Sequence, residues 1–168
     1  CSWLEQSASG QGGLGILTGP AGSGKSFLTR HLENEARQRG FSTGHGRFER
    51  RGRSRMPWPW PQVLRGLGGK ETTQLARELM QEGLAAPLEE REGLLGSSGM
   101  GAGRLVIPLV DALDAHSSSG PLLLIFDDLQ DCDAASAEVL LLVAEALTSL
   151  DRIPPGSLRQ CSTDDNMT

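Results

Sequence analysis

One short run constrains the fold of this chain more than any other feature. It occupies residues 19–26 and reads Gly-Pro-Ala-Gly-Ser-Gly-Lys-Ser, which fits the pattern G-x-x-x-x-G-K-[ST] at every fixed position. An apolar, strand-like stretch at 14–18 leads into the run, and a helical pattern at 26–39 follows it. Strand, glycine-rich loop and helix in this order are typical of a phosphate-binding loop. The run therefore predicts a nucleotide site in an α/β fold.

Each residue type in the run has a chemical role toward a polyphosphate. Glycines let the backbone turn sharply and present consecutive N–H groups to one point, and the following helix adds its positive end. Lys25 is expected to reach the β- and γ-phosphates as a catalytic residue, and the Ser26 hydroxyl to ligate Mg²⁺. The predicted nucleotide contacts are Gly19, Pro20, Ala21, Gly22, Ser23, Gly24, Lys25 and Ser26.

A second signal comes about a hundred residues later. Residues 122–126 form a continuous apolar run, typical of a strand buried on both faces, and Asp127 and Asp128 follow it directly. Carboxylates at the end of a buried strand need a cation or a water network. We predict that Asp127 joins Ser26 in binding Mg²⁺, and that Asp128 is catalytic and orients or deprotonates the attacking water. An ordinary polar strand end remains the alternative for both residues.

Composition sets further limits. The net charge of −5 argues against direct nucleic-acid binding. The sequence contains no stretch of about twenty apolar residues, so we expect no membrane-spanning helix. The cysteines Cys1, Cys132 and Cys161 are far apart, which favours a reducing, cytoplasmic setting. Because the chain begins with Cys1 and not with Met, we interpret it as a fragment or a processed product. We expect a flexible lead-in at 1–12, a partial P-loop domain at 13–150 and a linker or disordered tail at 151–168.

Between the two signals the pattern is less specific. We expect a second strand within 41–48, helices at 62–67 and 72–82, a mobile loop at 83–103, and further helices around 105–113 and over 134–150. The last helix is apolar almost all round, which predicts burial on more than one side. Two features have open interpretations. The cluster Arg47, Arg50, Arg51, Arg53 and Arg55 forms either a solvated loop, which we favour, or a phosphate contact. Trp58 and Trp60 are either buried, which we favour, or stacked on a base or partner.

Taken together, four segments resemble a known family. They are residues 19–26, Gly-Arg-Phe-Glu at 46–49, Trp-Pro-Trp-Pro-Gln-Val-Leu-Arg at 58–65 and Pro-Leu-Leu-Leu-Ile-Phe-Asp-Asp-Leu-Gln-Asp-Cys-Asp at 121–133. This order is similar to the AAA-type ATPase module related to replication-origin recognition proteins. The module also occurs in multidomain signal-transduction ATPases, such as large bacterial transcription regulators and soluble-type adenylate cyclases. The resemblance covers about residues 13–150.

The resemblance implies a P-loop NTPase three-layer sandwich with a parallel sheet, binding ATP and Mg²⁺. It also implies effector domains elsewhere in the same protein. The sequence departs from the family at Asp131 and Cys132, where the family has Trp and Ala, whereas Asp133 matches. We identify no later strand with a polar sensor residue, no arginine finger and no winged-helix lid. In the family that strand lies between the loop strand and the Asp-Asp strand, so we expect a sheet that is incomplete at its C-terminal side.

Three functions therefore remain open. The favoured one is an Mg-ATP-binding and hydrolysing module whose output is a conformational change in a regulatory protein. The second is a truncated module that binds a nucleotide or a partner without turnover. The third is a P-loop kinase acting on a small molecule, which would need an acceptor pocket that the sequence does not reveal.

Overall fold

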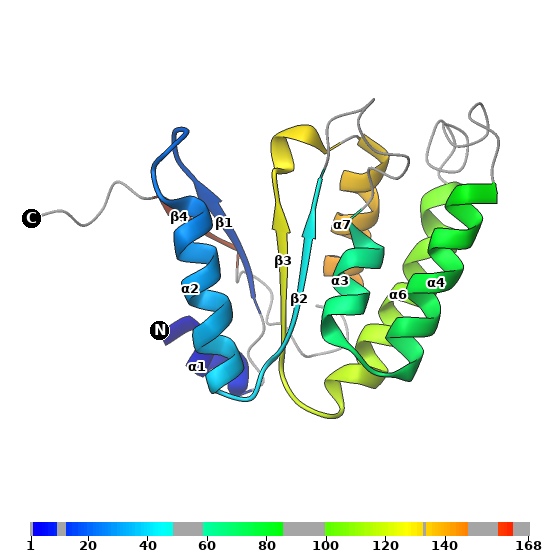
Figure 1. Cartoon of the computed structure of the whole chain (residues 1–168), viewed down its shortest axis with the longest axis horizontal. Coiled ribbons are helices and arrows are strands. Elements are labelled where there is room, and N and C mark those ends of the chain that lie inside the picture. The colour runs from blue at the N-terminus through cyan, green and yellow to red at the C-terminus, as the bar shows by residue number, and fades with distance from the viewer. Residues whose placement is uncertain are drawn as a thin grey trace, which may run out of the picture.

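The computed structural model describes residues 2–9, 13–48, 59–85, 100–132, 134–147 and 158–162. Within them, helices are interspersed with parallel strands, as in an α/β fold (Figure 1). The elements, in chain order, are α1 (Ser2–Ala8), β1 (Leu14–Thr18), α2 (Lys25–Gln38), β2 (Ser42–Arg47), α3 (Trp60–Leu67), α4 (Lys70–Ala85), α6 (Met100–Ser117), β3 (Leu122–Asp127), the 3-10 turn η1 (Leu129–Asp131), α7 (Ala134–Leu147) and β4 (Leu158–Ser162).

The strands form two parallel pairs. β1 pairs with β4 in the register Leu14↔Leu158, and β2 pairs with β3 from Ser42↔Leu122 to Arg47↔Asp127. Among the described residues no strand pairing joins one pair to the other. The parallel arrangement brings the carboxyl ends of β2 and β3 to one edge, where ligands of α/β proteins commonly bind.

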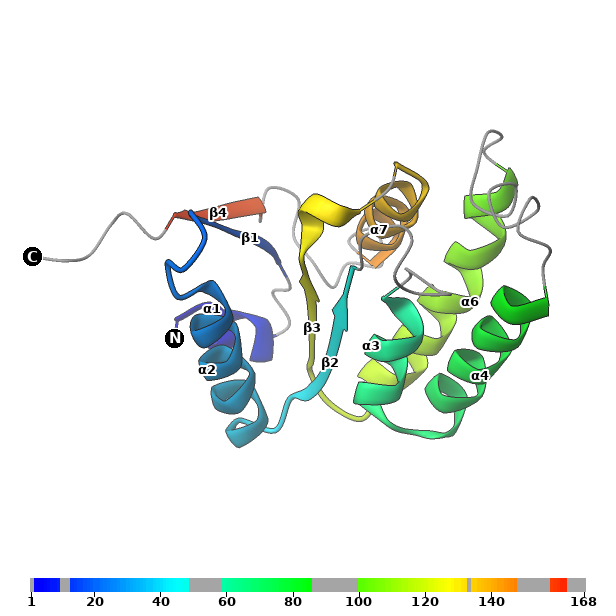
Figure 2. The same ribbon diagram turned by 45° about the horizontal axis from the view of Figure 1, so that its top comes forward.

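Strand β3 separates two apolar cores. Its Leu123 and Ile125 side chains are buried with Leu4 of α1 and Ala36 of α2. Alternate residues of the strand, Phe126 among them, pack on the opposite side against the larger core. That core is built on α3, α4, α6 and α7, which lie together on the right of Figures 1 and 2. The prediction that both faces of this strand are covered is confirmed.

Helix α3 packs against β2 with almost no space between the two backbones. A Cβ atom added at Gly44 would lie 2.6 Å from the carbonyl oxygen of Val63, and one added at Gly46 would lie 2.6 Å from that of Pro59. Only glycine fits at such distances, so the two strand glycines set the position of α3. The Trp60 side chain then enters the larger core, with its ring edge-on to Phe126 at a centroid separation of 4.9 Å. The preferred interpretation of Trp60 as a buried residue is confirmed, whereas Trp58 lies outside the described residues.

Two sequence-based expectations need correction. The flexible lead-in at 1–12 contains helix α1, whose Leu4 is buried; few apolar residues mark this segment, so its packing was not evident. The tail at 151–168 contains β4, because pairing with β1 uses the backbone and needs no apolar pattern.

Helix α7 has a wide apolar face. Val139 and Val143 are buried, and Leu140 and Leu142 also pack against the larger core, whereas Leu141 is 56% exposed.

The expected mobile loop at 83–103 is wrong at both of its ends. Helix α4 continues to Ala85 and α6 already begins at Met100, while residues 86–99 lie outside the described part of the chain. Pro108 lies inside α6.

Candidate functional site

The run at 19–26 forms a turn between β1 and α2. Gly22 and Gly24 adopt φ values of 81° and 88°, and no atom lies within 4 Å of where a Cβ would be at either residue. The structure shows no hydrogen bond from the backbone N–H of Gly22, Gly24, Lys25 or Ser26 to any described residue. The first N–H groups of a helix have no acceptor in their own helix, and here they stand beside an open turn. This arrangement suits an anion.

The Lys25 ammonium lies over the same turn. Its Nζ atom donates hydrogen bonds to the carbonyl oxygens of Gly19 and Pro20, each at 2.8 Å. Phosphate oxygens are stronger acceptors for an ammonium than neutral carbonyls are, because their bonds are charge-assisted. The loop therefore positions a cation that can transfer its hydrogen bonds to a phosphate.

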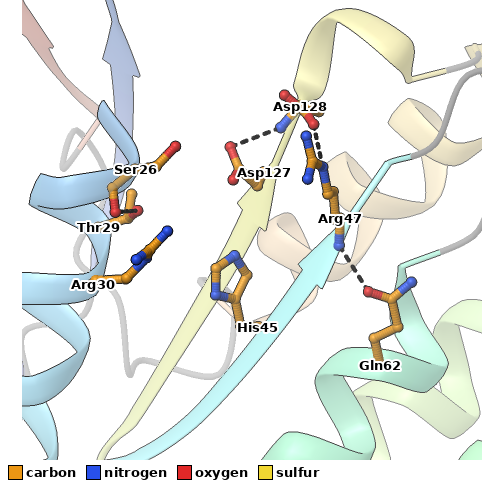
Figure 3. A pocket seen from close by; sticks show the side chains of 8 residues that line it. All are labelled: Ser26, Thr29, Arg30, His45, Arg47, Gln62, Asp127 and Asp128. Carbon is orange, nitrogen blue, oxygen red and sulfur yellow. Dashed lines mark hydrogen bonds and ion pairs between the residues drawn. The ribbon is translucent and has the colours of Figure 1, made fainter. Parts of the chain in front are cut away.

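A cavity of about 500 Å³ lies beside the N-terminal turns of α2 (Figure 3). It brings together three of the predicted site residues, Ser26, Asp127 and Asp128, although about a hundred residues separate Ser26 from the two aspartates in the sequence. The loop residues 19–25 do not line it. The remaining lining residues are Thr29 and Arg30 of α2, His45 and Arg47 of β2, and Gln62 of α3.

The two aspartates are held differently. Asp128 adopts a left-handed conformation with φ 57° and ψ 44°, the one positive φ outside glycine in the described ranges. Its backbone N–H donates to Asp127 Oδ1 at 3.0 Å, which orients the Asp127 carboxylate. The Asp128 carboxylate accepts hydrogen bonds from Gln130 Nε2, at 2.9 Å, and from Arg47 Nε. These two bonds, with Gln130 contributing most, lower the pKa of Asp128 below its ordinary value.

Arg47 connects three elements. It is the last residue of β2 and lies opposite Asp127 in the strand register. Its guanidinium pairs with Asp128, and its backbone N–H donates to Gln62 Oε1 of α3 at 3.1 Å. The expectation that Arg47 belongs to a solvated loop is therefore wrong, although its side chain is 65% exposed. Arg50, Arg51, Arg53 and Arg55 lie outside the described residues.

A polar network supports the opposite side of the cavity. His45 Nδ1 lies 3.7 Å from Glu33 Oε2, and Arg37 binds both Glu33 Oε1 at 2.5 Å and Thr43 Oγ1 at 2.8 Å. Sequence reasoning did not select Thr29, Arg30, His45 or Gln62. Two signals were available: Arg30 is four residues after Ser26 and so on the same helix face, and His45 is two residues before Arg47 on the same strand face.

The comparisons with known proteins agree with this geometry. Residues 1–154 match the family described as AAA ATPase domain. The chain belongs to the AAA ATPase domain family. It is thus a nucleotide-binding module, and the match includes α1, which sequence reasoning had placed outside the domain. No curated protein and no solved structure matches the chain. None of the helices in the described ranges has the length and apolar character needed to cross a membrane.

Proposed function

We propose that this AAA ATPase domain binds and hydrolyses Mg-ATP as a switch within a regulatory protein. The observation that carries the proposal is the cavity that brings Ser26 at the start of α2 next to Asp127 and Asp128 at the end of β3. A hydroxyl and a carboxylate on facing elements are the oxygen ligands that Mg²⁺ prefers. Mg²⁺ would neutralise charge on the terminal phosphates.

The loop supplies the rest of the phosphate site. Unbonded backbone N–H groups at Gly22, Gly24, Lys25 and Ser26 can donate to phosphate oxygens, and the Lys25 ammonium can do the same. We propose further that the two strand pairs belong to one parallel sheet in a three-layer sandwich, with α1 and α2 on one face and α3, α6 and α7 on the other.

Asp128 is the proposed base for the attacking water. In this structure its carboxylate is ionised and accepts hydrogen bonds from Gln130 and Arg47. Both hydrogen bonds stabilise the ionised form, so accepting a proton from water becomes more favourable when Asp128 exchanges at least one of these partners. The Arg47 backbone N–H also donates a hydrogen bond to Gln62 of α3. A movement of Arg47 away from Asp128 would therefore couple hydrolysis to the position of α3. This connection supports a role in signalling, as in the multidomain regulators that the sequence resembles.

The same contacts favour a second candidate function. A carboxylate held by two partners is a weaker base than a free one. The structure therefore also supports a module that binds the nucleotide without turnover. Binding and hydrolysis have to be measured separately to decide between the two functions.

Binding is tested with Lys25→Ala. The variant should lose most of its affinity for Mg-ATP, about tenfold or more, because charge-assisted hydrogen bonds contribute about 1.5–3 kcal/mol. Lys70→Ala removes the chain's other lysine, an exposed residue at the start of α4, and is the matched control. Equilibrium titration with a fluorescent ATP analogue gives both affinities. Equal affinities for the two variants would show that the loop assignment is wrong.

The two aspartates are expected to give different phenotypes. Asp127→Asn should weaken the Mg²⁺-dependent part of ATP binding. Asp128→Asn should leave binding nearly unchanged and slow phosphate release by about 10²–10⁴-fold, the range for loss of a general base. Asp111→Asn, on the exposed side of α6, is the control. Wild-type phosphate release that is undetectable, with normal binding, would favour the module without turnover.

A further inference from the structure

The cavity beside the carboxylates has the size of a small-molecule site. Its volume of about 500 Å³ falls within the range of about 300–1,000 Å³ for such sites. It lies at the carboxyl ends of β2 and β3, the edge at which α/β proteins bind ligands. A second ligand therefore has space next to the terminal phosphate.

The charges around the cavity are divided between two sides. Asp127 and Asp128 lie on one side, with Asp128 neutralised by Arg47. Arg30 and His45 project from α2 and β2 on the other side (Figure 3). Arg30 has no hydrogen-bond or ion-pair partner among the described residues, and the described contacts of His45 involve only Nδ1. This basic side has donors that no protein acceptor uses.

We propose that Arg30 and His45 bind a small oxyanion, a phosphate or a carboxylate, at the same time as the nucleotide occupies the loop. The guanidinium fork matches two oxygens of either group, and an imidazole N–H can donate to a third or share one of them. The proposal rests on the proposed function, since the nucleotide is bound beside this subsite. It adds a second ligand that the hydrolysis reaction itself does not need.

The subsite is distinct from the position of the γ-phosphate. Arg30 follows Lys25 by five residues, which places its Cα about 7.5 Å farther along the helix axis at about 1.5 Å per residue. Among the residues with unbonded loop N–H groups, Gly22, Gly24 and Lys25 do not line the cavity, whereas Ser26 lines it at the helix start. Asp127 does line it and would repel an anion. Oxyanion binding should therefore be tighter when Asp127 ligates Mg²⁺ than when it does not.

The experiment adds inorganic phosphate to the full chain in three states. In the first state the protein is saturated with Mg-ATPγS, in the second it is saturated with Mg-ADP, and in the third only Mg²⁺ is present. Phosphate binding in each state is measured by isothermal titration calorimetry. Phosphate should bind saturably to both nucleotide complexes. Arg30→Gln should weaken this binding about tenfold or more, and Arg30→Lys should restore part of it. Arg77→Gln, an exposed arginine on α4, should have no effect. A parallel titration with succinate shows whether phosphate or carboxylate is preferred.

Each failure has a distinct signature. If the nucleotides bind but neither anion does, the oxyanion subsite is wrong and the proposed function stands. If phosphate binds the ADP complex and ATPγS displaces it, the anion occupies the γ-phosphate position and the separate subsite is again wrong. If the nucleotides fail to bind, the proposed function is wrong; the Mg²⁺ state then decides the subsite by whether phosphate binding depends on Arg30.

Discussion

The two sides of this molecule differ in how completely they are packed. On the helical side, made of α3, α4, α6 and α7 with β2 and β3, the Trp60 side chain is 1% exposed and several leucines are fully buried. On the loop side, made of β1, α2 and the turn between them, Phe27 is 78% exposed, and Ile16 and Leu28 are also exposed. Apolar burial is the main source of stability in a folded domain. The helical side therefore stabilises the fold, whereas the loop side holds groups for a ligand.

This difference is consistent with a nucleotide switch. On the loop side, backbone N–H groups have no acceptor among the described residues, and few apolar side chains are buried. Regions with few buried contacts open at low free-energy cost, and binding sites are commonly drawn from them. Ligand binding should therefore raise the local stability of the loop side more than that of the helical side.

The strongest test of the comparison pairs two aromatic truncations. Trp60→Ala removes a buried indole that contacts Phe126, and it should lower the free energy of unfolding by about 3–5 kcal/mol. Phe27→Ala removes an exposed ring and should change it by no more than about 0.5 kcal/mol. Urea denaturation of both variants gives the two values. A large loss of stability in Phe27→Ala would show that the loop side is packed in solution.

Nucleotide binding should reduce the difference in local stability between the loop side and the helical side. At a free concentration of about a hundred times the dissociation constant, Mg-ATPγS should stabilise the protein by about 2.7 kcal/mol. Amide hydrogen exchange should slow first at Gly22, Gly24, Lys25 and Ser26, because their N–H groups gain acceptors. The amides of α4 are the internal control. Protection confined to α4 and α6 would mean that the nucleotide binds elsewhere.

The contact between β2 and α3 gives a third test. Gly46→Ala places a methyl group against the Pro59 carbonyl, so α3 has to shift, at a cost of about 1–3 kcal/mol in stability. Ser42→Ala, at the other end of β2, lacks this contact and should cost less. Because Gln62 of α3 binds the Arg47 backbone, the Gly46 variant should also disturb the Arg47–Asp128 pair. Unchanged thermal unfolding of Gly46→Ala would contradict the packing seen here.

Local pattern was sufficient to predict the parts of the site that are continuous in sequence. The run at 19–26 and the apolar run ending in Asp127 each carry their own signal, and the strands and helices around them were predicted within a few residues. Helix α1 and strand β4 were missed for a different reason. Leu4 is buried only because Ala36 and Phe41 are brought near it, and β4 is defined by its pairing with β1. Neither cause is visible within the segment itself.

The contact between Arg47 and Asp128 at the cavity depends on long-range geometry in the same way. Arg47 and Asp128 are 81 positions apart and meet because β2 and β3 pair in one particular register. Glycine has a low propensity for strands, so Gly44 and Gly46 give no strand signal in the sequence. In the structure they are the positions at which α3 approaches the sheet. A pattern of single residues cannot specify such a contact until the neighbouring element is placed.

The smallest expected effect concerns the acidity of Asp128. The pKa of Asp128 should lie below its ordinary value, and Gln130→Ala and Arg47→Ala should each raise it, because each removes a hydrogen bond to the ionised carboxylate. Carbon-detected NMR titration of the Asp128 carboxyl measures the shift. Gln74→Ala, which removes a similar bond to Glu78 on α4, should leave the pKa of Asp128 unchanged.

The sign of the linked stability follows from the direction of this shift. A carboxyl whose pKa is lower in the folded protein contributes stability above its unfolded pKa, and that contribution is lost as the pH falls through the folded value. The contribution should be less than about 1 kcal/mol, because Arg47 is largely exposed to solvent. An ordinary pKa for Asp128 in the wild type would mean that the pair does not form in solution. A low pKa that rises when Mg-ATPγS binds would show that Asp128 has exchanged its partners, which favours its role as the base. A pKa that stays low would show that Asp128 keeps its hydrogen bonds to Gln130 and Arg47 when the nucleotide is bound.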